Sequence, residues 1–332
     1  MFDIVTFGSA TRDIFLRPKK LSLLKYDSSA REGVCFPVGS KIEIEDIYFN
    51  SGGGGTNTAA TFANQGLKTA YCGVVGEDSA GREIIKELES LKINTGFVFL
   101  KNDKLTNHSV IIAENNKDST ILAYRGAAEL LSKEEISWQK LKTGWMYLAP
   151  LTGLLCDIFN DIVEFACVNG IKIAANPSVA QLSLNNFVKI ANKIDILILN
   201  QEEASFLAKI SVEDEKGIFQ KIDKICPGVA IMTKGGEGVV VSDGKNLYSA
   251  KPFKERKIVD TTGAGDAFGS GFVFEFMRSQ DIEKSIQFAM ANSAGCLSEI
   301  GAKNGLLKKG QEFNRIEIIK RECDNDVCFV KK

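Results

Sequence analysis

The segment DTTGAGDAFGSGF, residues 260–272, carries the most specific pattern in the chain. A polar turn, 261–265, leads directly into an amphipathic stretch that we expect to be a helix. Small residues allow backbone N–H groups to converge, and a helix N-terminus adds a positive dipole, so the turn is suited to hold an anion. Asp266 would repel an anion that was only bound. We interpret it as a base that takes a proton from a hydroxyl beside a phosphoryl group, the alternative being a helix cap.

Outward from this segment, short β-branched runs alternate with longer amphipathic stretches. Residues 281–297 repeat apolar side chains at three- or four-residue steps, which predicts a helix. Alternating strands and helices favour an α/β fold with a mostly parallel sheet covered on both faces, and its ligands bind beyond the carboxyl ends of the strands. Six runs are candidate strands: IVTFG (4–8), TAYCGVVG (69–76), WMYLA (145–149), IKIAAN (171–176), IDILILN (194–200) and VAIMTKG (229–235).

Two stretches interrupt this alternation, at about 14–50 and 97–126. They contain short alternating runs such as KIEIEDIYF and NHSVIIAE, and no helix of useful length. Alternation of this kind is typical of half-buried strands. We expect the two insertions to pair into a small β-sheet lid over the active site of a single domain, 1–332.

Composition excludes several classes of protein. The chain has 332 residues and a formal net charge of −1, so no basic field points to nucleic acid or to an anionic membrane. No apolar run reaches the roughly 20 residues that span a bilayer, and the N-terminus, with an acid at Asp3, does not read as a signal peptide. Eight irregularly spaced cysteines and one histidine indicate reduced thiols in a cytoplasmic protein without a zinc site.

Two other phosphate-binding patterns fail on spacing. In a dinucleotide-binding G-x-G-x-x-G motif, the third glycine would fall at Phe268. Five residues separate Gly238 from Gly244, whereas four separate the glycines of a P-loop. Asn246 follows Lys245 at the position where a P-loop has Ser or Thr.

A second signal is SGGGGTNTAATFANQG, residues 51–66. Four glycines precede a helix that we expect to start at Thr56, with Asn57 in its first turn. Glycine allows a substrate to approach the backbone closely, and asparagine offers both a donor and an acceptor to sugar hydroxyls. The alternative is a flexible loop before a capped helix.

GGGTNTA, followed by Gly66 and Gly76, and DTTGAGDAFGSGF resemble the two signature regions of the ribokinase-like (PfkB) carbohydrate kinase family. The resemblance covers nearly the whole chain, with both signatures in the family's order. It implies a doubly wound α/β domain with a β-sheet lid. It also implies that Asp266 is the catalytic base and that the anion hole is formed by Gly263, Ala264 and Gly265.

Other positions match the family's pattern one at a time. FGSATRD resembles its first strand, whose terminal acid, here Asp13, binds substrate hydroxyls beside Gly53, Gly54 and Asn57. Asn200 and Glu203 match an N-x-x-E motif that positions Mg²⁺ and phosphate through water. TKGGEG resembles the nucleotide-phosphate loop, which implies contacts from Thr233, Gly235, Gly238 and, further on, Asn292. Asp260 and Thr262 match positions that hold a monovalent cation such as K⁺ in some members.

The residues themselves leave simpler roles open for some of these positions. Glu203 on a new helix can merely complement the helix dipole, and Thr233 and Gly235 can be ordinary strand-end residues. Asp78, in GEDSAG, is better explained as a helix cap than as a ligand.

Three departures from ribokinases leave the substrate open. Thr11 stands where they place Asn, and Ala149 and Pro150 stand where they carry an acid. The lid insertion DSSAREGVCFPVG is also longer than in compact sugar kinases.

We therefore expect a phosphotransferase that uses ATP and Mg²⁺ to phosphorylate a hydroxymethyl group of a sugar or nucleoside. The alternatives are an adenosine-type nucleoside kinase specifically, a non-catalytic ligand sensor that has kept the fold, and a dinucleotide-dependent oxidoreductase. A homodimer formed through the lid is a further expectation.

Overall fold

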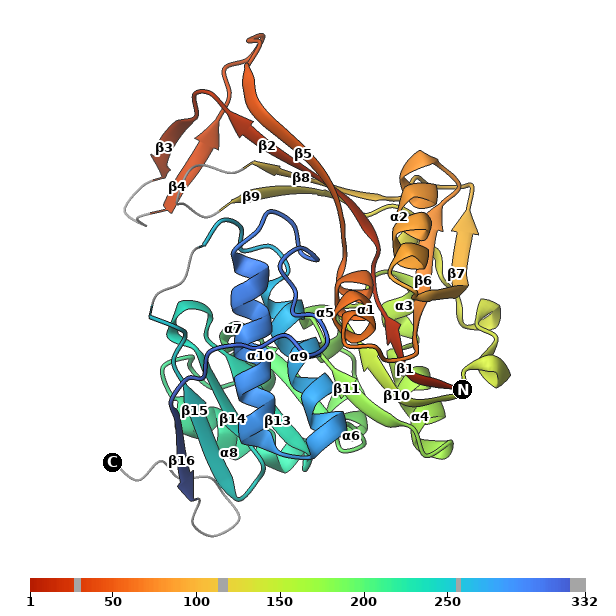
Figure 1. Ribbon diagram of the computed structural model, residues 1–332, viewed down its shortest axis with the longest axis vertical. Coiled ribbons are helices and arrows are strands. Elements are labelled where there is room, and N and C mark those ends of the chain that lie inside the picture. The colour runs from red at the N-terminus through yellow and green to blue at the C-terminus, as the bar shows by residue number, and fades with distance from the viewer. Residues whose placement is uncertain (27–30, 113–118, 255–257, 323–332) are drawn as a thin grey trace.

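The chain is described by a computed structural model that covers residues 1–26, 31–112, 119–254 and 258–322 (Figure 1). Within these residues, a ten-stranded sheet has the order β16-β15-β14-β13-β12-β11-β10-β1-β6-β7. Its strands are β1 (Phe2–Phe7), β6 (Thr69–Gly76), β7 (Asn94–Lys101), β10 (Thr143–Leu148), β11 (Lys172–Ala175), β12 (Ile196–Asn200), β13 (Val229–Thr233), β14 (Val239–Ser242), β15 (Asn246–Ala250) and β16 (Ile318–Glu322).

The order of the sheet is doubly wound about β1. The chain runs outward from β1 through β6 to β7, then returns to β10 on the other side of β1 and continues through β11 and β12 to β13. These pairs are all parallel, whereas β13 to β16 pair antiparallel. All six candidate strands are confirmed. The strand order reverses between β1 and β10, and open α/β sheets bind ligands at such a switch point.

Helices cover both faces of this sheet because its buried strands are apolar on both sides. From β1, Val5 and Phe7 enter one core and Ile4 enters the other. The Ile4 side is covered by α1 (Gly54–Asn64), α2 (Ser79–Ser90), α9 (Ala264–Ser279) and α10 (Ile282–Leu297). The other side is covered by α3 (Leu154–Asp157), α4 (Phe159–Val168), α5 (Val179–Leu182), α6 (Phe187–Ala191), α7 (Gln201–Ala208) and α8 (Glu215–Ile225). Short 3₁₀ turns lie at Ala127–Leu130, Lys133–Glu135, Trp138–Lys140 and Gly235–Glu237.

The predicted helix over 281–297 is α10, which packs along α9 (Figure 1). Asp281 caps it by accepting a hydrogen bond from the Lys284 N–H at 3.0 Å. Asp78 likewise caps α2, as expected, because its side chain accepts from the Gly81 N–H at 2.8 Å.

A separate four-stranded sheet forms the lid, which projects from one end of the main domain (Figure 1). Its order is β5 (Ile44–Gly52), β2 (Thr11–Pro18), β8 (Asn107–Ile112) and β9 (Thr120–Tyr124). A two-stranded ribbon, β3 (Ser22–Tyr26) and β4 (Arg31–Cys35), extends it. The second insertion starts later than expected, since 97–101 belong to β7 in the main sheet. The parts of the expected lid at 27–30 and 113–118 lie outside the described residues.

No helix in the described part of the chain is long and apolar enough to cross a membrane.

Candidate active site

The glycine-rich segment 51–57 passes over the carboxyl ends of β1 and β10. Gly8, which follows β1, lies so close that a Cβ on it would sit 2.6 Å from the Gly55 nitrogen. The helix α1 begins at Gly54, two residues before the predicted start, and its N-cap is Gly53 with a φ of 96°. Only glycine adopts this conformation readily, and a Cβ on Gly53 would lie 2.4 Å from the Ser9 carbonyl oxygen. The run is therefore tightly packed and is not a flexible loop.

Asn57 and Asp266 meet across this segment. Asn57 Nδ2 donates a hydrogen bond to Asp266 Oδ2 at 2.9 Å. The other carboxylate oxygen lies 3.4 Å from where a Cβ on Gly54 would be. Asp266 lies in the first turn of α9, and the N-terminus of this helix has no side-chain cap. Asp266 therefore does not cap the helix. Burial raises the pKa of Asp266, and the Asn57 hydrogen bond opposes that shift.

The turn before α9 has the geometry of an anion site. Gly263 is the N-cap with a φ of 78°, and within the described residues the N–H groups of Gly263, Gly265 and Asp266 have no acceptor. A Cβ on Gly265 would meet nothing within 4 Å, so open space adjoins these donors. Ala264 N–H turns back to the Thr261 carbonyl oxygen at 3.3 Å, which leaves Gly263 and Gly265 as the open members of the predicted anion hole.

Asp13 closes the site from the lid. Its side chain is 4% exposed, and it rests on Gly52, where a Cβ would lie 1.9 Å from Asp13 Oδ2. Burial raises the pKa of Asp13 to about 6, although a hydrogen bond from Ser109 lowers it. Thr11 and Asp13 are both buried on the same side of β2, as the strand periodicity predicts.

Arg12 points away from Asp13, as expected for adjacent residues in a strand. It pairs with Glu83 of α2 at 3.0 Å and lies over the Phe49 ring at 5.4 Å. The Arg12 guanidinium is therefore engaged on the other face of the lid.

Sequence reasoning missed Lys303, whose side chain is 7% exposed and pairs with Glu87 at 3.5 Å. It also donates a hydrogen bond to Ser51. Its charge acts on Asp13 and Asp266 and lowers the pKa of both. The available signal was GAKNG, 301–305, a lysine between two glycines after a helix.

The predicted phosphate and metal residues form a second group. Asn200 and Thr233 are neighbours at the ends of β12 and β13. Asn200 Oδ1 accepts from the Glu203 N–H at 2.8 Å, and Glu203 Oε2 accepts from the Asn200 N–H at 2.9 Å, which is a reciprocal capping box. Burial raises the pKa of Glu203. The helix-end role is therefore present, and one carboxylate oxygen of Glu203 is left for another partner.

This donor set fits magnesium only if phosphate and water complete the coordination. Among the described residues there is no group of three or more His, Cys, Asp or Glu side chains that can hold a metal. Mg²⁺ commonly keeps several waters and binds one or two carboxylates together with substrate phosphates, so a single oxygen of Glu203 is compatible with it.

The predicted nucleotide loop is a tight turn after β13. Gly235 has a φ of 52° and Gly238 a φ of 104°. Lys234 N–H bonds the Gly238 carbonyl oxygen at 2.8 Å, and Thr233 Oγ1 lies 3.4 Å from the Leu199 carbonyl oxygen. A Cβ on Gly235 would meet nothing within 4 Å, so the turn adjoins open space at that residue.

Asp260 and Thr262 tie two loops together. Asp260 Oδ1 accepts from the Thr262 N–H at 2.9 Å, and Oδ2 accepts from the Gly301 N–H at 2.9 Å. Both oxygens already have backbone partners, so the monovalent cation stays a prediction.

Asn292 does not open onto a ligand site. It is fully buried, and its Nδ2 donates to Ala267 O at 2.8 Å and to Thr61 Oγ1 at 3.2 Å. Its Oδ1 accepts from the Leu307 N–H at 2.9 Å. A nucleotide contact would require these bonds to break, so in this structure Asn292 joins α10 to α1 and α9 instead.

Ala149 lies under the glycine-rich segment. It is 0% exposed, because it lies beneath Gly8 and Gly54, on each of which a Cβ would come within 2.9 Å of the Ala149 Cβ. It therefore contributes no surface to an acceptor, whereas the adjacent Pro150 is half-buried.

The two groups share one edge of the sheet without touching. Three strand steps separate β1 from β12, which is about 14 Å at the usual strand spacing. One end of this edge thus holds Asp13, Asn57 and Asp266, and the other end holds Asn200 and Glu203. A ligand that joins the two groups must be elongated.

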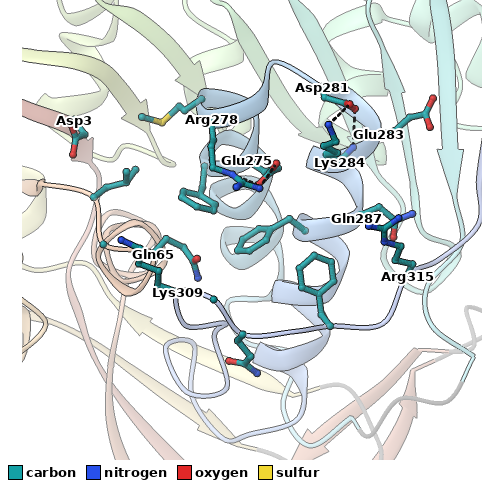
Figure 2. A pocket seen from close by; sticks show the side chains of 18 residues that line it. Asp3, Gln65, Glu275, Arg278, Asp281, Glu283, Lys284, Gln287, Lys309 and Arg315 are labelled. Carbon is teal, nitrogen blue, oxygen red and sulfur yellow. Dashed lines mark hydrogen bonds and ion pairs between the residues drawn. The ribbon is translucent and has the colours of Figure 1, made fainter.

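A large cleft of about 1050 Å³ lies away from this edge (Figure 2). Its lining includes Glu275 and Arg278 near the end of α9 and Gln287 of α10. Glu275 follows Asp266 by nine residues, about 13 Å along the helix axis. None of the predicted site residues lines this cleft.

Comparisons with known proteins identify relatives of this chain in sequence and in fold. A family profile described as "pfkB family carbohydrate kinase" matches residues 1–309. The chain is 27% identical over 282 residues to a ribokinase of Haemophilus influenzae, covering 80% of this chain and 87% of that one. It is 27% identical over 272 residues to a nucleoside kinase of Methanothermobacter thermautotrophicus, covering 80% and 84%. Among solved structures, a ribokinase of Giardia lamblia superimposes with a TM-score of 0.76 at 19% identity, covering 93% and 98%.

Proposed function

Because the chain belongs to the pfkB family of carbohydrate kinases, we propose that it transfers the γ-phosphoryl group of ATP to a hydroxymethyl group of a sugar or nucleoside. The observation that carries this proposal is the pairing of Asp266 with Asn57 beside the uncapped N-terminus of α9. A base and a set of free N–H donors then adjoin the same space.

In the proposed reaction, Asp266 accepts the proton of the acceptor hydroxyl. The hydroxyl oxygen bonds to the γ-phosphorus, the bond to the β,γ-bridging oxygen breaks, and ADP leaves. The N–H groups of Gly263 and Gly265 face the negative charge of the transferring group. Positioning and charge stabilisation account for most catalysis of this kind.

Magnesium would be held by Glu203 through water and by the phosphates of ATP, and it would neutralise charge on those phosphates. Asn200 and Glu203 lie across the edge of the sheet from Asp266. This separation supports an elongated nucleotide lying along the carboxyl ends of the strands, with its terminal phosphate at the α9 turn.

The inner face of the lid favours a nucleoside as acceptor. In the sheet register, Asp13 pairs with Asn50 and Ser109, so these three polar residues form one row. Phe15, Tyr48 and Ile111 form the next row on the same face; Tyr48 is exposed, whereas Phe15 and Ile111 are buried. An apolar row that opens at Tyr48 accommodates a base or alkyl group better than a ring hydroxyl that would lose its partners. This register supports the adenosine-type alternative.

We also propose that two chains associate through the outer face of the lid. There the register aligns Phe49, Ile14, Val110 and Leu122 across four strands, and Phe49 and Leu122 are exposed. Contiguous apolar surface of this kind marks association sites. Sedimentation of the wild type and of Phe49→Lys tests it: a monomeric wild type contradicts the proposal.

A coupled assay of ADP release, run across sugars, phosphosugars and nucleosides, tests the reaction itself. We expect acceptor-dependent release that is lost in Asp266→Asn. If no acceptor stimulates release while a ligand still binds, the non-catalytic sensor is the better description.

A further inference from the structure

Lys303 is a buried cation on the segment that follows α10. Its side chain is 7% exposed, and its ammonium group lies 3.5 Å from Glu87 Oε1. The ammonium group also donates to Ser51 Oγ, which donates in turn to Glu87 Oε2. Burying a lysine lowers its pKa, and the nearby carboxylates counteract this shift. A cation is kept in such a place only when partners offset the cost of desolvation.

Four consecutive residues connect Lys303 to both site carboxylates. Ser51 accepts the Lys303 hydrogen bond, Gly52 supports the Asp13 carboxylate, and Gly54 lies against Asp266. The segment 51–54 therefore holds the ammonium group and both carboxylates close together.

The anion turn is the other neighbour of Lys303. Ala302, the preceding residue, packs against Gly263, where a Cβ would lie 2.3 Å from the Ala302 Cβ. The Gly301 N–H donates a hydrogen bond to Asp260 Oδ2. The backbone that precedes the lysine is thus fixed relative to the site.

The site is rich in negative charge. Besides Asp13 and Asp266 there are two further carboxylates: Asp260, whose charge raises the pKa of Asp13, and Glu87 on α2, which pairs with Lys303. Arg12 pairs with Glu83, lines one small pocket with Ser51, Glu87 and Lys303, and also lowers the pKa of Asp13. Burial raises the pKa of both Asp13 and Asp266, so a nearby cation is needed to favour their ionised forms. In the described part of the chain, Lys303 is the cation whose charge reaches both Asp13 and Asp266.

We propose that Lys303 is a positioning residue that keeps Asp13 and Asp266 ionised together, so that acceptor binding and proton abstraction operate in one pH range. The inference rests on the proposed phosphoryl transfer, because it gives both carboxylates a role as anions. Glu87 opposes this effect, since its negative charge offsets part of that of Lys303.

The test compares the pH dependence of kcat/KM in three site variants and one control. Lys303→Met removes the charge with little change in length, so the acidic limb should move to higher pH by about one unit. Lys303→Arg should restore the wild-type limb. Glu87→Gln should move the limb to lower pH. Lys309→Met, at an exposed lysine of the distant cleft, should leave it unchanged.

A lysine with a merely structural role would lower stability or rate without moving the limb. The proposal is overturned if the acidic limb lies at the same pH in Lys303→Met and Lys309→Met. Should Lys303→Met not fold, the proposal is overturned if Glu87→Gln leaves the acidic limb at its wild-type pH. Carbon-13 carboxyl shifts of the aspartates provide a readout that does not require turnover. If no acceptor is phosphorylated but the titrations of Asp13 and Asp266 still shift, the proposed function fails and the role of Lys303 in ionisation survives.

Discussion

Asn57 Nδ2 and Asp266 Oδ2 are 2.9 Å apart although 209 residues separate them in the chain. The amide donates to the carboxylate, which favours the ionised form and holds one oxygen in place. The second oxygen is left beside Gly54. This contact joins the two glycine-rich segments into one site, and the first prediction below depends on the carboxylate that it holds.

Asp266→Asn should reduce kcat by about 10²–10⁴-fold while ATP and acceptor still bind, because a general base acts mainly in the transition state. Single-turnover kinetics and binding isotherms separate the two effects. Near-normal turnover in a folded variant would remove Asp266 from the role of base.

Glu203→Gln should raise the Mg²⁺ concentration needed for half-maximal rate, because a hard cation prefers an anionic oxygen. Glutamine can still accept the hydrogen bond of the capping box, so the free energy of unfolding should stay nearly constant. Glu202→Gln on the same turn serves as the control. If the dependence on Mg²⁺ is unchanged, Glu203 is a helix-end residue only.

Asp13→Ala should reduce kcat/KM for any diol acceptor, because each charge-assisted hydrogen bond contributes about 1.5–3 kcal/mol. In the wild type, kcat/KM for adenosine should exceed that for ribose, owing to the row of Phe15, Tyr48 and Ile111 on the lid. Measuring both substrates with both proteins checks both statements. An unchanged kcat/KM in Asp13→Ala would contradict the role of Asp13. A much higher kcat/KM for ribose than for adenosine would contradict the preference for a nucleoside.

Asp13→Asn should stabilise the protein near pH 8 and not near pH 4. The folded pKa of Asp13 is about 6 against an ordinary 3.8, so ionisation opposes folding as the pH rises through this window. The gain at pH 8 has an upper limit of about 3 kcal/mol, at 1.36 kcal/mol for each pKa unit. Urea denaturation at the two pH values measures it. An equal effect at both would mean that the Asp13 carboxylate costs no stability through its charge.

Short-range sequence patterns predicted several strands and one long helix. The strands β1, β6, β10, β11, β12 and β13 and the helix α10 follow from β-branched runs and from apolar side chains at three- or four-residue steps. The start of α1 was misplaced because Gly54 and Gly55 have low helix propensity. Contacts with Gly8, Ser9 and Tyr71, none of them adjacent in the chain, hold those glycines in the helix.

The amino-acid sequence was enough to predict the family, the alternation of strands and helices, and an anion-binding turn before Asp266. Tertiary structure alone decided which groups meet: Asn57 with Asp266, Asp13 on Gly52, and Lys303 between them, with Asn292 turned into the core. Periodicity and turn composition depend on neighbours in the chain. Burial and ion pairing depend on residues brought together by folding, and the Lys303–Ser51 hydrogen bond spans 252 positions. For that reason the proposed role of Lys303 could be inferred only from the folded chain.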